Sequence, residues 1–374
     1  MDNIFLSFSL AFLVTFFAIP VIIQVTKEKK MFDEPDERKV HKGVIPTLGG
    51  LGIFGGFILA TLLGVPVGGA HYLQYFVASL MVIFFLGIKD DILIISATKK
   101  FIGQLIAAGI LIKFGNIQID NMHGLFGLEK IPNTASITLT MFTIIVITNS
   151  FNLIDGVDGL AGSLGLLTAL VFGIYFLLIN QIMFSVMAFS LAGSLVGFLI
   201  YNFSPAKIFM GDTGSLIIGL LNSIFVIKFI SIAADPLIKY PLQATPALGF
   251  AVLIVPLFDT LRVFGLRILN RRSPFSADRN HVHHFLLDIG LSHKMITLTC
   301  VSVNILFILT AYFLQAIGTT WVMLILSSLA VLFIGIIYYS RPKRASATIH
   351  SINEKTIITP SKIFSLTADR IEHN

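Results

Sequence analysis

The chain has 374 residues, of which 12% are charged and 55% are apolar, and its mean hydropathy is +0.89. An ordinary soluble domain carries about 25% charged residues, so this chain has too little polar surface to cover a water-soluble globule. The composition excludes a soluble protein and indicates that lipid surrounds most of the chain. We attribute the net charge of +6 to loops that orient a membrane protein, and we expect no nucleic-acid partner.

Eleven apolar segments follow one another along the chain, each close to the roughly 20 residues that cross a bilayer as a helix. The first has no basic region before it and no clear small-residue cleavage site, so we expect a retained helix rather than a signal peptide. The segments lie at 4–25, 47–65, 71–88, 97–114, 134–152, 159–179, 182–203, 214–233, 244–266, 294–314 and 319–340. They predict an all-α polytopic membrane protein with one membrane domain over 1–340 and a flexible cytoplasmic tail over 341–374.

The basic residues between these segments predict the orientation of the chain. Cytoplasmic loops carry an excess of Lys and Arg. If the N-terminus lies outside, the inner loops hold nearly all the loop cations, and only Lys130 and Lys239 fall in outer loops. The C-terminus is then cytoplasmic, and we expect a multi-pass membrane protein.

Polar residues gather at the ends of the segments that this topology places on the inner face. They are Asp90, Asp91, Asn149, Asn152, Asp155, Asp158, Asp212, Asp259, His281, His283 and His284. Acids that converge from several helices repel one another unless a cation lies among them. Hard cations such as Mg²⁺ bind carboxylates together with substrate phosphates. The pattern predicts a cytoplasmic metal and phosphate site.

The histidine cluster 281–284 admits two interpretations. Clustered histidines can bind a transition metal, but no cysteine lies nearby to complete a structural zinc site. The basic residues Arg271, Arg272 and Arg279 precede the cluster and favour anion recognition instead.

Five sequence patches, in this order, resemble the polyprenyl-phosphate N-acetylhexosamine-1-phosphate transferases, a family that includes the MurNAc-pentapeptide translocase of peptidoglycan synthesis. They are Asp36-Glu-Arg-Lys-Val-His-Lys42 with Pro46-Thr-Leu-Gly-Gly50; Gly87-Ile-Lys-Asp-Asp91; Asn149 to Gly159; Phe209-Met-Gly-Asp-Thr-Gly-Ser215; and Ser273 to His284. The last patch is similar to the GlcNAc-1-phosphate branch, because Val282 interrupts the run of three histidines that is usual in the peptidoglycan branch.

The resemblance implies transfer of a sugar 1-phosphate from a UDP-N-acetylhexosamine to undecaprenyl phosphate, with release of UMP. It implies Mg²⁺, with Mn²⁺ as an alternative, at Asp212 and Asp91, and catalytic roles for Asp90, Asp91, His281, His283 and His284. The substrate-binding residues it implies are Lys42, Asn149, Asn152, Asp155, Asp158, Phe209 and Arg279.

Several alternatives remain open from the sequence. The donor sugar could be MurNAc-pentapeptide, and the chain could instead be a transporter of a lipid-linked or anionic solute, although transporters usually bind substrate at mid-depth. Direct attack by the acceptor phosphate and a covalent aspartyl intermediate both fit the residues. The product could feed O-antigen of lipopolysaccharide or another surface polymer, and a homodimer is compatible with the resemblance.

Overall fold

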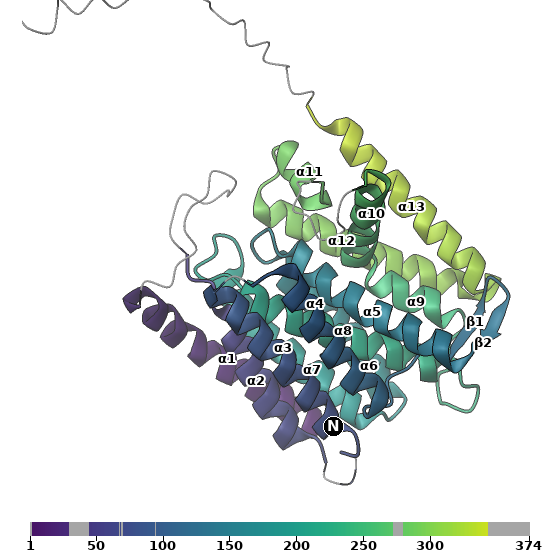
Figure 1. Ribbon diagram of the computed structural model, residues 1–374, viewed down its shortest axis with the longest axis horizontal. Helices are drawn as coiled ribbons and strands as arrows, with labels where there is room; N and C mark the ends of the chain where they lie inside the picture. Colours follow the sequence, from purple (N-terminus) through teal and green to yellow (C-terminus); the bar gives the residue numbers. More distant parts are fainter. Residues whose placement is uncertain are drawn as a thin grey trace, which may run out of the picture. The chain divides into compact units, whose positions relative to one another are not determined.

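The computed structural model describes residues 2–29, 45–66, 68, 70–93, 95–271 and 280–342, and within them the protein is almost entirely helical (Figure 1). The longer helices are α1 (Asp2–Glu28), α2 (Gly49–Gly64), α3 (Leu73–Leu93), α4 (Ala97–Lys113), α5 (Asn133–Ile154), α6 (Leu160–Leu178), α7 (Ile182–Asn202), α8 (Gly211–Ala233), α10 (Ile254–Leu269), α12 (His293–Leu314) and α13 (Thr319–Ser340). The short elements are β1 (Asn121–Leu125), β2 (Leu128–Lys130), α9 (Thr245–Val252), α11 (Val282–Asp288) and the 3₁₀ turn Gln315–Ile317. The predicted tail 341–374 lies almost wholly outside the described residues.

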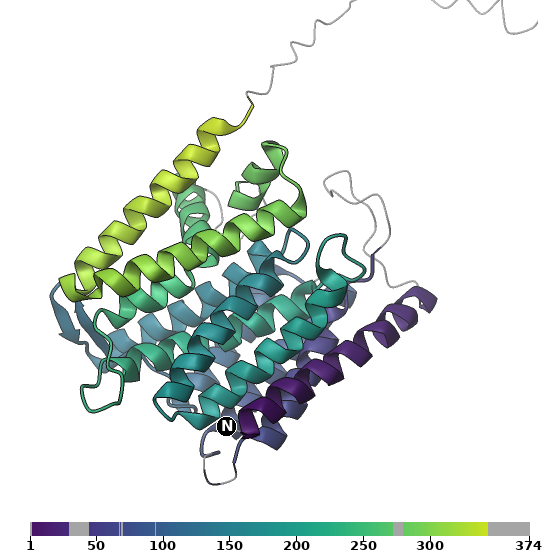
Figure 2. The same cartoon turned by 180° about the vertical axis from the view of Figure 1, so that it is seen from behind.

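Helix α8 forms the centre of the fold and is buried on nearly all sides, with α2, α3, α5, α6 and α9 packed around it. Helices α1 and α13 lie at the periphery (Figure 2). Each of them buries only one stripe of side chains. Their other faces are also apolar, and Phe17 on α1 is 65% exposed. A helix that is apolar all round yet partly uncovered is typical of a lipid-facing position.

Helices occupy all eleven predicted apolar segments, and among the described residues seven helices are long and apolar enough to cross a membrane. The bent pair α9 and α10 would make an eighth span. Helix α2 has 16 residues, which at 1.5 Å per residue gives about 24 Å. The structure therefore shows a polytopic membrane protein with seven or eight clear spans.

The ninth predicted segment, 244–266, is not one straight helix. Helices α9 and α10 meet at Leu253 with a bend of 89°. Pro256 lies one turn beyond the break, and a proline lacks the N–H that would bond the carbonyl four residues earlier, which here belongs to Val252. Apolar composition predicted the segment, but this proline changes its course.

A β-hairpin that the sequence analysis did not predict lies between α4 and α5. Its strands β1 and β2 are antiparallel, and Phe126 and Gly127 connect them with φ values of 54° and 77°. Two positive φ values at the turn are typical of a type I′ hairpin. Thr319 donates to the carbonyl of His123 at 2.5 Å, so the hairpin is attached to the beginning of α13 (Figure 1).

Candidate active site

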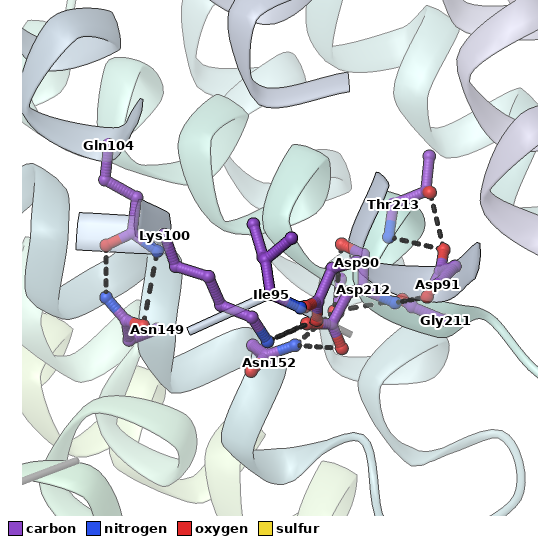
Figure 3. A network of polar contacts seen from close by, with 11 residues as sticks. Asp90, Asp91, Ile95, Lys100, Gln104, Asn149, Asn152, Gly211, Asp212 and Thr213 are labelled. Atoms are coloured by element: carbon purple, nitrogen blue, oxygen red, sulfur yellow. Dashed lines mark hydrogen bonds and ion pairs between the residues drawn. The ribbon is translucent and has the colours of Figure 1, made fainter. Parts of the chain in front are cut away.

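Three of the predicted acids, Asp90, Asp91 and Asp212, come together where α3 and α5 end and α8 begins (Figure 3). Close backbone contact brings these helix ends together. A Cβ atom on Gly87 of α3 would lie 2.4 Å from the Cα of Thr213, and one on Gly50 of α2 would lie 2.2 Å from the amide nitrogen of Gly214. Only glycine allows helices to approach so closely, so these two residues set the position of the first turn of α8.

Lys100 of α4 lies between two of the predicted carboxylates. Its ammonium is 2.6 Å from Oδ2 of Asp212 and is also paired with Oδ2 of Asp90. The backbone N–H of Ile95 donates to Oδ1 of Asp90 at 2.7 Å. The buried Asp90 is therefore held from two sides, and the lysine neutralises two acids that would otherwise repel.

Asp91 points to the N-terminus of α8. Its Oδ1 accepts from the backbone N–H of Asp212 at 2.7 Å, and its Oδ2 accepts from the N–H and hydroxyl of Thr213 at 3.0 and 2.5 Å. The first N–H groups of a helix have no partner inside the helix, and a carboxylate there also interacts favourably with the helix dipole. Asp91 therefore caps α8 from a neighbouring helix and fixes the backbone of Asp212.

The two predicted asparagines share one face of α5, as their spacing of three residues indicated. The amide of Asn152 donates to Oδ1 of Asp212 at 2.9 Å and to the hydroxyl of Ser215 at 3.0 Å. The amide of Asn149 pairs with that of Gln104 on α4, at 2.7 and 3.3 Å. Asn152 is thus a direct neighbour of Asp212, whereas Asn149 connects α5 to α4.

Asp155 and Asp158 lie in the turn between α5 and α6. Burial raises the pKa of Asp155 well above its usual range, and the charges of Asp212 and Asp91 raise it further. Oδ1 of Asp158 is 3.2 Å from Nδ1 of His293, and its Oδ2 accepts from the N–H of Ala206 at 3.2 Å. The carboxyl of Asp155 is therefore close enough to Asp212 and Asp91 to be affected by their charges. The carboxylate of Asp158 instead contacts α12 and the loop before α8.

The histidine motif begins at His281, which a buried acid of α10 holds. Nδ1 of His281 is 2.8 Å from Oδ2 of Asp259, and the N–H of Val282 donates to Oδ1 of the same acid at 3.1 Å. Arg262 donates to that Oδ1 at 2.9 Å. Asp259 thus fixes both the ring of His281 and the start of α11.

His283 connects the histidine motif to the acidic turn. A Cβ atom on Gly156 would lie 2.5 Å from Nε2 of His283, so the ring packs directly on the turn that carries Asp155. Its plane is nearly parallel to that of His281, and the ring of His284 lies 4.3 Å away. Burial, followed by the neighbouring charge of His284, lowers the pKa of His283 to about 3, so this ring is neutral at physiological pH.

Phe209 is placed by its backbone beside the first sequence patch. Its N–H donates to the carbonyl of Pro46 at 2.7 Å, and its carbonyl accepts from the N–H of Gly49 at 2.9 Å. The segment before α2 and the segment before α8 are therefore joined. Lys42 and Arg279, predicted to bind substrate, lie outside the described residues.

Comparisons with known proteins identify the family of this chain. A probable undecaprenyl-phosphate N-acetylglucosaminyl 1-phosphate transferase of Bacillus subtilis is 32% identical over 338 residues, which cover 90% of this chain and 92% of the relative. The family model for glycosyl transferase family 4 matches residues 73–230. The chain belongs to this family.

Two further relatives of this glycosyl transferase family 4 member carry related names. A decaprenyl-phosphate N-acetylglucosaminephosphotransferase of Mycobacterium leprae is 34% identical over 314 residues, covering 77% of this chain and 78% of the relative. An undecaprenyl-phosphate alpha-N-acetylglucosaminyl 1-phosphate transferase of Escherichia coli O157:H7 is 28% identical over 321 residues, covering 83% and 84%. The resemblance predicted from the five sequence patches is confirmed.

The structure places at this site further residues to which the sequence analysis assigned no specific role. The sequence gives Lys100 no role beyond that of a basic residue near the inner face, and it marks Asp259 only as one of the acids of that face. Gln104 and His293 were not considered. Their signals in the sequence are weak, because each partner lies on a different helix and far away along the chain, as Lys100 and Asp212 do.

In the part of the chain that the structure describes, no three His, Cys, Asp or Glu side chains are grouped so as to hold a metal ion by themselves. Asp90 and Asp212 nevertheless share one cation, the ammonium of Lys100. Two carboxylates that already share a positive charge fit Mg²⁺, which takes few protein ligands and completes its shell with water and substrate phosphates.

Proposed function

We propose that this protein transfers N-acetylglucosamine 1-phosphate from UDP-GlcNAc to undecaprenyl phosphate and releases UMP. An oxygen of the acceptor phosphate attacks the β-phosphorus of the donor, and the bond from that phosphorus to the bridging oxygen of UMP breaks. The relatives are named for N-acetylglucosaminyl phosphate transfer to polyprenyl phosphates, and this favours GlcNAc over a MurNAc-pentapeptide. The observation that carries the proposal is the cluster of Asp90, Lys100, Asn152 and Asp212 at one end of the helices.

The reaction brings two phosphate-bearing substrates together, so positive charge must neutralise them. Lys100 is the described cation nearest to both acids, and we assign it to the phosphates of the reacting groups. Asp90 lies beside it and can accept a residual proton of the acceptor phosphate, whose second pKa is about 6.

Mg²⁺ would be held by Asp212, with Asp90 beside it, and would supply charge neutralisation for the transferring phosphate. Asp91, which the resemblance implied as a metal ligand, already uses both oxygens on the first turn of α8. We therefore assign Asp91 to support of the metal-binding residue rather than to the metal.

We also propose that all eleven apolar segments cross or enter the bilayer, with the N-terminus outside and the site on the cytoplasmic side of a bacterial inner membrane. The distribution of Lys and Arg supports this orientation. UDP-sugars are soluble nucleotides and the acceptor has a prenyl tail, so a polar site at a membrane surface serves both. The lipid-linked sugar would be the first intermediate of a surface polysaccharide.

The test uses membranes that contain the full chain, with Mg²⁺, undecaprenyl phosphate and a panel of radiolabelled UDP-sugars. We expect lipid-soluble label from UDP-GlcNAc, release of UMP rather than UDP, and loss of both in EDTA. Lys100→Met should lower turnover by roughly 100-fold, as when a charge-stabilising donor is removed, while Lys99→Met, on the adjacent lysine, should not. Absence of lipid product with every donor would contradict the proposal and favour a transporter.

A further inference from the structure

The break between α9 and α10 leaves backbone groups that no helix can satisfy. Residues 251–255 are almost all buried, and Pro256 cannot donate to the carbonyl of Val252. A backbone group that is buried away from water and left unpaired is strongly unfavourable. A bend of 89° among these buried residues therefore needs partners from another helix.

One side chain of α12 supplies those partners. The amide of Asn304 donates to the carbonyl of Val252 at 3.0 Å and to that of Ala251 at 3.4 Å. The N–H of Val255, on the other side of the break, donates to its Oδ1 at 3.3 Å. Asn304 is 0% exposed, so a single buried amide bonds the end of α9 and the start of α10 together.

The course of α10 decides where the histidine motif lies. Asp259 and Arg262 are on α10, and Asp259 holds both His281 and the first N–H of α11. At the break, the regular hydrogen bonding of α9 does not continue into α10. Its direction therefore depends on side-chain contacts at the break and on its packing against α5 and α12.

We propose that Asn304 is a positioning residue for the transferase reaction: it fixes the angle between α9 and α10 and thereby places Asp259 and His281 at the site. This inference deepens the proposed function and rests on it. Asn304 does not touch the reacting groups, and its effect passes through α10.

The chain offers a matched control in Asn222. This residue is also 0% exposed, within α8. Its amide donates only to the carbonyl of Ile218 in its own helix, at 2.9 Å, and its Oδ1 has no partner among the described residues. Replacement of Asn222 by leucine removes a buried amide without removing a hydrogen bond between helices.

The chain also contains its own reporter. Cys300 is the single cysteine of the sequence, lies one turn before Asn304 on α12 and is 1% exposed. If α10 moves away from α12, a membrane-permeant maleimide should reach this thiol faster. The alkylation rate measures the packing directly and does not depend on any activity.

The experiment compares Asn304→Leu with Asn222→Leu and the unchanged protein in native membranes. For Asn304→Leu we expect normal insertion into the membrane. The rate of Cys300 alkylation should rise at least about tenfold, and kcat/KM for UDP-GlcNAc should fall at least about tenfold. The KM for the donor should rise, while the KM for the acceptor should stay unchanged. Partial unfolding would lower only the apparent kcat. If the leucine variant does not fold, Asn304→Asp takes its place. The aspartate keeps an acceptor for the N–H of Val255 but loses the donor to Val252 and Ala251, so its alkylation rate and donor KM should change by smaller amounts.

Two results would overturn the inference. One is an Asn304→Leu protein whose alkylation rate and donor KM equal those of the unchanged protein. The other is an Asn222→Leu protein with the same changes as Asn304→Leu, which would make the effect a general consequence of losing a buried amide. If the unchanged protein transfers no sugar phosphate, the proposed function fails, whereas the alkylation contrast still decides whether Asn304 holds the break.

Discussion

The two neighbouring acids at the end of α3 have different surroundings despite their adjacent positions. Asp90 faces the ammonium of Lys100, while Asp91 faces the N–H groups of Asp212 and Thr213. The resemblance implied catalytic roles for both acids. The geometry therefore gives the two acids different roles: Asp90 can meet substrate, whereas Asp91 holds the first turn of α8. This difference can be measured.

Asp91→Asn should destabilise the protein. Asp212→Asn should inactivate the protein without destabilising it. An asparagine at position 91 would keep one acceptor for the N–H groups of α8 and lose the charge, which should cost about 2 kcal/mol of unfolding free energy. Asp212→Asn should lower turnover strongly with little change in stability. Thermal unfolding followed by Cys300 exposure, together with label transfer, measures both. Full stability with lost turnover in Asp91→Asn would show that its carboxylate acts in the reaction.

Asp155 gives the protein a pH-dependent stability. Because burial raises the pKa of Asp155, the folded chain binds this proton more tightly than the unfolded chain, whose carboxyl has a pKa near 3.9. Stability from this group is therefore present at low pH and is lost as pH rises through the folded pKa. Asp155→Asn stays neutral throughout.

The melting temperature of Asp155→Asn should exceed that of the unchanged protein at alkaline pH, and the difference should shrink as the pH falls toward 4. Melting curves in EDTA across this pH range measure the effect without metal. A difference that stays constant with pH would mean that Asp155 is not ionising at a raised pKa in the folded protein.

At the scale of helices, the site depends on how closely α3 approaches α8. Gly87→Ala should push the two backbones apart, since its new methyl would lie 2.4 Å from the Cα of Thr213. Overpacking of this kind costs about 1–3 kcal/mol, and the displaced Asp91 would release the first turn of α8. We expect lower stability and lower turnover together.

Gly109→Ala on α4 is the matched control, because nothing lies within 4 Å of a Cβ atom at that position. Its stability should be equal or higher, by roughly 0.5–1 kcal/mol from helix propensity. Both variants are read by Cys300 exposure on heating and by label transfer. Equal behaviour of the two would show that contact between α3 and α8 does not control the site.

The sequence predicted the helices well because length and apolar composition decide them, but it did not predict their interruptions. Pro256 turned one predicted segment into α9 and α10, and the Phe126–Gly127 turn formed a hairpin inside a short connection. The acids were found because they lie at helix ends. Lys100 was not found as a functional residue, and Asp259 was found only as one of the acids at the inner face, because only the folded chain shows that they face Asp212 and His281.

Considered as a whole, the molecule keeps its reactive polar groups at one end of the bundle. The acids lie at the C-terminal ends of α3 and α5 and at the N-terminal end of α8, while the hairpin and the beginning of α13 lie together at the other ends of these helices (Figure 1). Helix α8 has 23 residues, about 35 Å at 1.5 Å per residue. The two ends can therefore contact opposite surfaces of one bilayer.

This separation allows the orientation to be tested with two single cysteines in a Cys300→Ser background. The two variants are Lys130→Cys and Lys207→Cys. Position 130 is exposed on the hairpin strand β2, and position 207 is exposed in the loop before α8, five residues from Asp212. If the loops rich in Lys and Arg lie on the cytoplasmic side, a membrane-impermeant maleimide added to spheroplasts should label position 130 at once. It should label position 207 only after permeabilisation. The reverse pattern would place the acids outside, where no cytoplasmic UDP-sugar could reach them, and would contradict both the orientation and the proposed donor.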